Sequence, residues 1–75
     1  IEYALPVASP VLLSVYGVLG QRIRVLVSDS NHKAGYHSMT WDGRDDNGRA
    51  VGSGLYLYRL RAGDFTQVRK MTLLK

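Results

Sequence analysis

The chain has 75 residues, no cysteine and a formal net charge of +4 at pH 7. This length predicts one small domain of marginal stability, because so short a chain buries only about 60% of its unfolded surface. No disulfide can compensate, and no apolar run approaches the roughly 20 residues of a membrane span. The chain begins with Ile1 and shows no signal-peptide pattern, so we expect it to be a piece of a longer protein.

The basic residues are spread along the chain rather than concentrated in one run. Several alternate with apolar residues, as in Arg59-Leu60-Arg61, which is typical of a solvated strand face. A nucleic-acid surface would cluster its charge and interleave aromatic side chains. The sequence therefore predicts no nucleic-acid partner.

Period-two alternation and turn residues, not helical periodicity, run through the sequence. Strands are expected at residues 1–5, where Pro6 closes the strand, and at residues 11–16. A glycine-bracketed turn at 17–20 leads into a third strand at 22–28, in which Leu26 breaks the alternation and indicates either a bulge or a second covered face. A polar loop at 29–35 precedes a fourth strand at 36–41. Two further strands are expected at 55–61 and 65–74, joined by a tight turn at 62–64.

One face of each expected strand is apolar and is assigned to the core. In the third strand, Arg22 and Arg24 are expected to point outward. The predicted core consists of Val11, Leu13, Val15, Ile23, Val25, Met39, Trp41, Tyr56, Tyr58, Leu60, Met71 and Leu73.

The turn between the fourth and fifth strands, residues 41–54, has the most specific chemistry in the chain. It opens on Trp41-Asp42-Gly43 and contains Asn47-Gly48, a dipeptide that readily takes positive φ at both positions. Its carboxylates, at positions 42, 45 and 46, are expected to accept backbone N–H groups as Asx-turns. The alternative, a calcium site, lacks the EF-hand spacing and would place two arginines beside the ion. Gly54 permits close backbone approach before the next strand.

Short strands with regular turn signals and no helix predict an all-β fold, an antiparallel immunoglobulin-like sandwich of six or seven strands. A small open barrel is the alternative architecture. Tyr56 and Tyr58 fit the places of the corner tyrosine and of the core position two residues later in such domains. Trp41 would then supply the large apolar plug of the core.

Taken in order, these elements resemble one family. The segments that carry the resemblance run from Val11 to Leu26, from Ala34 through Trp41-Asp42-Gly43 to Gly48, from Ser53 to Leu60, and over Arg69-Lys70-Met71. They are similar to the immunoglobulin-like domain of flagellar hook-capping proteins. They are also similar to the C-terminal sorting domains of proteins exported by the type IX (Por) secretion system. Such domains usually carry an upstream segment that leads into the first strand, whereas this chain starts inside that strand.

The resemblance implies a non-enzymatic role without cofactor or metal. The domain would be the C-terminal module of a larger secreted protein, exported through the periplasm and recognised at the outer membrane for sorting or surface attachment. Its partners would be the secretion or attachment machinery and the parent's N-terminal domains. Three basic residues near the end of the chain could be recognised by a partner: Arg69, Lys70 and Lys75.

Other functions remain open at this stage. His32 and His37 are the only histidines, and neither has a carboxylate or serine placed beside it by spacing, so catalysis is not indicated. Tyr16, Tyr36 and Phe65 are aromatic residues that the core does not need, and they leave open an accessory, carbohydrate-contacting domain of an extracellular hydrolase. A structural assembly module similar to the hook-capping domain is the third alternative.

Overall fold

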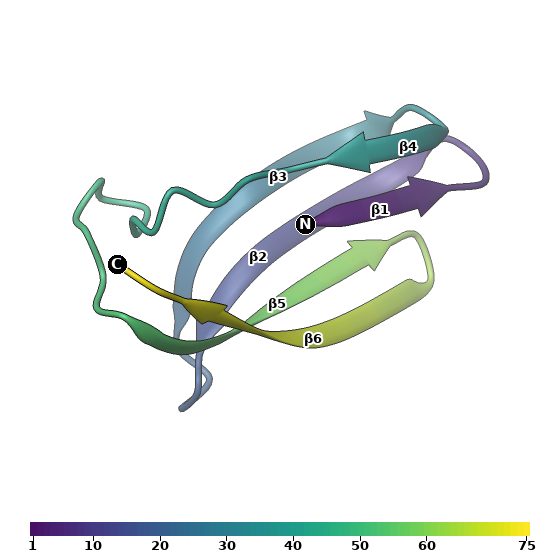
Figure 1. Cartoon of the computed structure of the whole chain (residues 1–75). Coiled ribbons are helices and arrows are strands. Elements are labelled where there is room, and N and C mark those ends of the chain that lie inside the picture. The colour runs from purple at the N-terminus through teal and green to yellow at the C-terminus, as the bar shows by residue number, and fades with distance from the viewer.

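The computed structural model describes residues 1–75 and contains six strands and no helix. The strands are β1 (Glu2–Leu5), β2 (Ser9–Gly17), β3 (Arg22–His32), β4 (Gly35–Ser38), β5 (Gly54–Ala62) and β6 (Phe65–Leu73), shown in Figure 1. They form two sheets, one with the order β3-β2-β5-β6 and one of β1 and β4. Every strand pair is antiparallel, so the predicted all-β antiparallel sandwich is confirmed.

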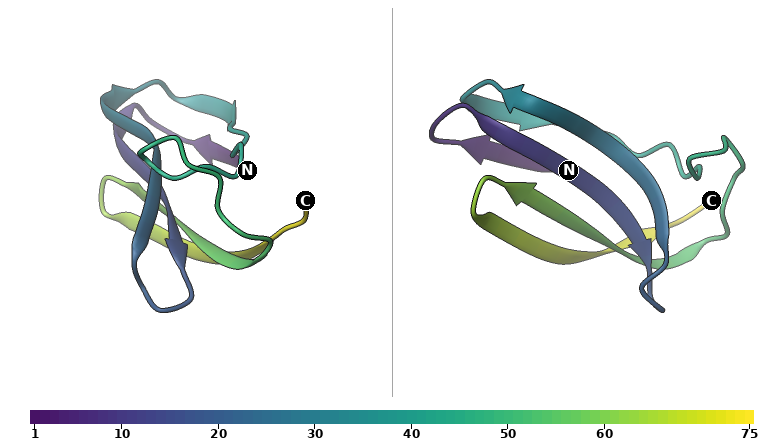
Figure 2. Two further views of the ribbon diagram at one scale, coloured as in Figure 1. Left: turned by 90° about the vertical axis from the view of Figure 1, so that its left-hand side faces the viewer. Right: turned by 180° about the vertical axis from the view of Figure 1, so that it is seen from behind.

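The strand order is that of an immunoglobulin-like sandwich. In that notation β1 and β4 take the places of strands B and E, and the sheet β3-β2-β5-β6 takes those of C′, C, F and G. Two hairpins, β2–β3 and β5–β6, build the larger sheet, which curves strongly (Figure 2). The connection from β4 to β5 passes from the smaller sheet to the larger one, and it contains the long turn.

Two strand boundaries differ from those expected by three residues or more. The third strand continues to His32, where it pairs with Ser9, so the predicted polar loop shrinks to the two residues before Gly35. The fourth strand ends at Ser38 rather than at position 41. Ile1 and Met39 still exchange backbone hydrogen bonds of 2.7 and 2.8 Å, one residue past the end of β4. Trp41 therefore lies beyond the ladder.

The bulge that Leu26 indicated is confirmed, and a second irregularity lies between Arg24 and Arg22, so the expected facing is reversed for Arg24 and Val25 while Arg22 and Val27 face as expected. Across the ladder, Val27 is opposite Leu13, but the next pair joins Val25 to Ser14, so Leu26 is the extra residue. Beyond the bulge, Arg24 is opposite the fully buried Val15 and shares its face. The prediction that Arg24 points away from the core is therefore wrong, and so is the inward assignment of Val25.

The core is smaller than the sequence predicted. Its buried hydrophobic residues are Leu5, Val11, Leu13, Val15 and Leu60, of which Leu5 was not expected. The other eight predicted core residues are only half-buried: Ile23, Val25, Met39, Trp41, Tyr56, Tyr58, Met71 and Leu73. The reason is geometric, because a sheet of two strands cannot cover the whole inner face of a sheet of four. An apolar groove of about 450 Å³, lined in part by Leu5, Leu60 and Phe65, marks one incompletely covered edge.

Candidate functional site

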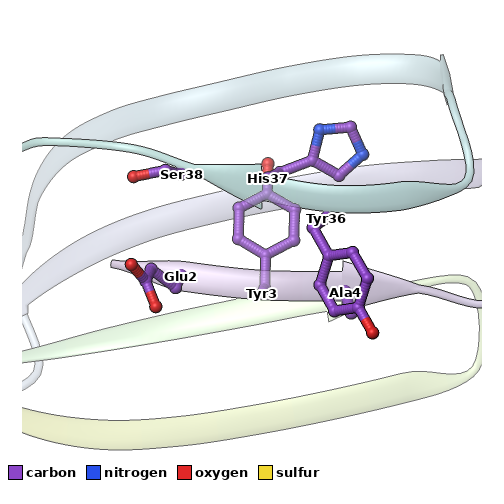
Figure 3. Close-up of a pocket in the computed structure, with 6 residues that line it drawn as sticks. All are labelled: Glu2, Tyr3, Ala4, Tyr36, His37 and Ser38. Carbon is purple, nitrogen blue, oxygen red and sulfur yellow. The ribbon is translucent and has the colours of Figure 1, made fainter.

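Both histidines meet Tyr3 beneath the smaller sheet. The Tyr3 hydroxyl lies 2.9 Å from Nε2 of His32, whose Nδ1 lies 3.2 Å from Oδ2 of Asp29. The His37 ring stacks on Tyr3 and lies 4.0 Å, centroid to centroid, from the His32 ring. In Figure 3, Tyr3 on β1 and His37 on β4 project from positions directly opposite in the ladder. These four residues, the histidine cluster, thus link β1, β3 and β4.

Hydrogen-bond chemistry assigns the protons of the cluster. A carboxylate can only accept hydrogen bonds. A neutral His32 therefore donates a hydrogen bond from Nδ1 to Asp29 and accepts one at Nε2 from the Tyr3 hydroxyl. His37 donates from Nε2 to the carbonyl oxygen of Lys33, 2.7 Å away. Burial, and then the Asp29 carboxylate, raise the pKa of Tyr3 above its ordinary value of 10.0. A raised pKa disfavours the phenolate, so the hydroxyl is not activated as a nucleophile despite the triad-like order of the groups.

The sequence analysis found no carboxylate beside either histidine, and for His32 this is wrong. The sequence predicts a loop at Asp29, and in a loop a separation of three residues does not fix how Asp29 lies relative to His32. The extended β3 instead holds Asp29 and His32 in one strand, at an irregular part of its pairing with β2. The cluster joins the two sheets through a chain of hydrogen bonds from Tyr3 on β1 to His32 and Asp29 on β3.

The Asp29 carboxylate makes part of the stability pH-dependent. The backbone N–H of Asn31, followed by His32, lowers the pKa of Asp29 below its ordinary value of 3.8. Its contribution is therefore complete above pH 3.8 and is lost as the pH falls through the lower folded value. We expect the urea midpoint of the wild type to exceed that of Asp29→Asn at pH 6, and the difference to shrink towards zero near pH 2. Asp64→Asn, which removes a carboxylate without hydrogen bonds, should show no such pH-dependent difference.

Three carboxylates hold the long turn together and fix it to β3. Oδ1 of Asp45 accepts the backbone N–H groups of Asn47 and Arg49 at 2.9 and 3.0 Å. Asp46 accepts from the backbone N–H of Val25 at 2.9 Å. Asp45 therefore caps the turn as expected, whereas Asp46 does not form the expected Asx-turn and instead anchors the turn to β3. The structure brings no group of metal ligands together here.

Asp42 ties the start of the same turn to the inward-facing arginine of β3. One of its oxygens accepts both the backbone N–H of Arg44, at 3.1 Å, and the guanidinium of Arg24, at 3.0 Å. Gly43 and Gly48 have φ values of 74° and 81°, a region that side chains with a Cβ resist. At Gly43 a Cβ would also lie 3.3 Å from Leu73, so the turn packs closely on the end of β6.

Trp41 and Tyr56 meet where the turn joins β5. Their rings are edge to face, with centroids 5.0 Å apart and planes at 73°. The indole Nε1–H donates to the carbonyl oxygen of Arg44 at 2.9 Å. The Tyr56 hydroxyl donates to the carbonyl oxygen of Gly52, four residues upstream, at 2.6 Å, which is the contact of a tyrosine corner. Gly54 begins β5 in this corner, and Tyr58 follows, half-buried opposite Val15.

Removing the corner hydroxyl should have a measurable but modest effect. We expect Tyr56→Phe to lower the free energy of unfolding by about 0.5–1.5 kcal/mol, because it removes one hydrogen bond and leaves the ring in place. Tyr58→Phe is the matched control, since the Tyr58 hydroxyl makes no hydrogen bond and its loss should change stability by less. Urea denaturation of both variants measures the difference, and equal losses would contradict a corner role for Tyr56.

The geometry agrees with the comparison to protein families. A family model described as the FlgD Ig-like domain matches residues 1–64. The chain belongs to the FlgD Ig-like domain family. The matched residues include β1 to β5 and the whole of the long turn. No curated protein and no solved structure matches the chain.

In this FlgD Ig-like domain, the three basic residues expected to be read by a partner do not form one cluster. Arg69 and Lys70 lie on opposite faces of β6, because successive side chains alternate across a strand. Arg69 is opposite Tyr58 on the inner face, and Lys70 is opposite Leu57 on the outer face. Lys75 lies beyond β6, beside the long turn, where its backbone N–H donates to the Ser53 hydroxyl at 3.1 Å. All three positions follow the residues matched to the family.

The spare aromatic residues do not form a common platform. Tyr36 is 93% exposed on β4, Phe65 is 57% exposed at the start of β6, and Tyr16 lies on β2 with the Arg59 guanidinium 5.6 Å from its ring centroid. A sugar platform needs exposed rings side by side, and these three are on three strands of two sheets. The structure also contains no helix with the length and apolarity needed to span a membrane.

Proposed function

We propose that this domain is a non-catalytic module of an exported protein and that a secretion or surface-attachment machinery at the outer membrane recognises it. Membership in the FlgD Ig-like domain family supports a structural, assembly-type role in general. The proposal is more specific, and it places the recognition on the C-terminal strand.

The observation that carries the proposal is the free edge of β6. This strand has nine residues, forms one end of the sheet and pairs only with β5. Its outer edge therefore presents unpaired backbone N–H and C=O groups, to which an extended segment of another protein can add as a further strand. The strand has basic side chains on both faces, at Arg69 and Lys70, and these would orient such a segment.

An export assay tests this proposal. The 75 residues are fused behind a folded reporter that is directed to the periplasm of a host with type IX secretion, and reporter at the cell surface or in the medium is measured. We expect export with the domain and periplasmic retention without it. Retention of a folded reporter that carries the folded domain would contradict the proposal.

Blocking the edge provides a sharper arm of the same assay. Val68→Pro removes a backbone donor from β6, and Val18→Pro, in the β2–β3 turn, is a matched surface control. If β6 is the recognised edge and both variants fold, only Val68→Pro should abolish export.

Self-assembly, the role of a structural module, makes a different prediction. Light scattering coupled to size exclusion at high concentration would then show a defined oligomer of the isolated domain. A monomer at all concentrations would favour the recognition role.

A further inference from the structure

Four basic residues that are far apart in the sequence lie on one face of the larger sheet. They are Arg22, Arg59, Arg61 and Lys70. The outer face of the larger sheet consists of the residues that alternate with the core residues along each strand, together with their partners across the ladder. One row across it is Arg22, Tyr16, Leu57 and Lys70; the next is Val25, Ser14, Arg59 and Val68; a third is Ser28, Leu12, Arg61 and Thr66. We call these twelve residues the basic face. None of them is acidic.

The charges of Arg59, Arg61 and Lys70 on this face are not neutralised within the domain. The only two salt bridges join Arg24 to Asp42 and His32 to Asp29, and neither involves the basic face. The three aspartates of the long turn accept hydrogen bonds from N–H donors, and two of them, Asp45 and Asp46, line a hollow beside Arg22 at the margin of the face. Adjacent strands lie about 4.8 Å apart, so Arg59, Arg61 and Lys70 concentrate their charge within one patch of three neighbouring positions. Such a patch attracts a partner that carries carboxylates or other anions.

The side chains between the charges favour a protein as that partner. Leu12, Leu57 and Val68 place aliphatic surface among the arginines, and Val68 is 55% exposed. Mixed aliphatic and arginine surface is typical of protein interfaces. Single-stranded nucleic acid would instead stack its bases on free aromatic rings, and the one aromatic of this face, Tyr16, is covered by Arg59.

A second observation points to the centre of the same face. Ser14 is only 1% exposed, and its hydroxyl has no hydrogen-bond partner. Tyr16 lies two residues along the strand from it, and Arg59 is directly opposite. Buried hydroxyls are normally paired. Ser14 therefore provides an unpaired hydroxyl at the centre of this face, next to Arg59 and Tyr16.

We propose that the basic face of the β3-β2-β5-β6 sheet is a docking surface for an acidic protein segment with interspersed apolar residues. This surface is distinct from the β6 edge, because it uses side chains that project from the sheet rather than backbone groups at its margin. The inference therefore goes beyond the export role and stands whether or not the domain is an export signal.

A defined probe tests the proposal on the whole 75-residue chain. A fluorescein-labelled peptide of alternating glutamate and leucine is titrated with the domain, and fluorescence anisotropy gives the dissociation constant. A heparin fragment and a single-stranded oligonucleotide of the same charge serve as probes of the other anionic classes. Amide chemical-shift changes locate the bound peptide. We expect saturable peptide binding that weakens with salt, with shifts concentrated on β2, β5 and β6.

Matched charge variants decide whether this face is responsible. Arg59→Glu/Arg61→Glu should weaken peptide binding about tenfold or more, as expected for loss of central interface arginines. Lys33→Glu/Arg49→Glu changes the net charge equally at loop positions and should leave binding within about twofold. Arg59→Gln/Arg61→Gln is the second variant if the glutamates prevent folding.

Three outcomes would overturn the proposal. The first is equal weakening by the face and loop variants, the second is tighter binding of heparin or oligonucleotide than of the peptide, and the third is no peptide binding.

Discussion

Replacing Leu13 by alanine is expected to lower the free energy of unfolding by about 2–5 kcal/mol, the range for deleting a buried leucine side chain. Leu13 is fully buried at the centre of β2, between Val27 of β3 and Leu60 of β5. It belongs to the cluster of Leu5, Val11 and Leu60 that joins the two sheets. Because so few residues are buried, the rest of the core cannot close around the cavity without losing its own contacts.

Urea denaturation followed by circular dichroism measures this loss. A domain of this size has a total stability of roughly 5 kcal/mol, so the variant should retain about 3 kcal/mol or less and unfold at a much lower urea concentration than the wild type. Leu19→Ala is the matched control, since Leu19 is 89% exposed in the β2–β3 turn and its truncation should cost less than about 0.5 kcal/mol. A loss below 1 kcal/mol at Leu13 would mean that the core lies elsewhere.

The sequence was sufficient for the fold because its local signals agree with one another. Alternation located all six strands, although β3 runs four residues further and β4 ends three residues earlier than expected. The bulge at Leu26 was detectable for the same reason, as a break in a regular period. These features depend only on residues near one another in the chain.

Burial was predicted less well because it depends on what covers a strand. Met71 and Leu73 have the alternation of core residues, but only two strands face the sheet that contains them. The facing of Arg24 and Val25 could not be derived either, since these two residues lie between two irregularities of β3, and each extra residue reverses the facing of the side chains that follow it.

The candidate sites were missed for a related reason. Tyr3 and His37 meet through the β1–β4 register, and His32 reaches them from the other sheet. Likewise, Arg22 and Lys70 share a face only because β2 and β5 lie between their strands. No spacing along the chain encodes such a neighbourhood, whereas the tyrosine corner lies within five consecutive residues and could be located from the sequence.

The fold separates three kinds of surface that recognition can use. The free edge of β6 offers backbone groups, the basic face offers cationic and aliphatic side chains, and the long turn is occupied with its own hydrogen bonds. A partner can therefore dock without rearranging the turn. Because its polar groups bond within the domain, the turn is expected to contribute to stability rather than to binding.

Replacing Trp41 by alanine is expected to lower the free energy of unfolding by about 2–3 kcal/mol, less than the 3–5 kcal/mol typical of a fully buried aromatic. The indole is half-buried, and its loss removes the edge-to-face contact with Tyr56 and the hydrogen bond to the Arg44 carbonyl. The turn that crosses between the sheets would then be held mainly by Asp42, Asp45 and Asp46.

Two further variants separate the contributions of the indole. Trp41→Phe keeps an aromatic ring but removes the Nε1–H donor, so it should cost about 1 kcal/mol plus the smaller loss of buried area. A double-mutant cycle of Trp41→Ala with Tyr56→Ala should give a coupling energy of about 0.5–1.5 kcal/mol for the ring pair. If Trp41→Ala were as stable as the wild type, the tryptophan would be a surface residue available to a partner, and the turn would have to be reconsidered as a binding element.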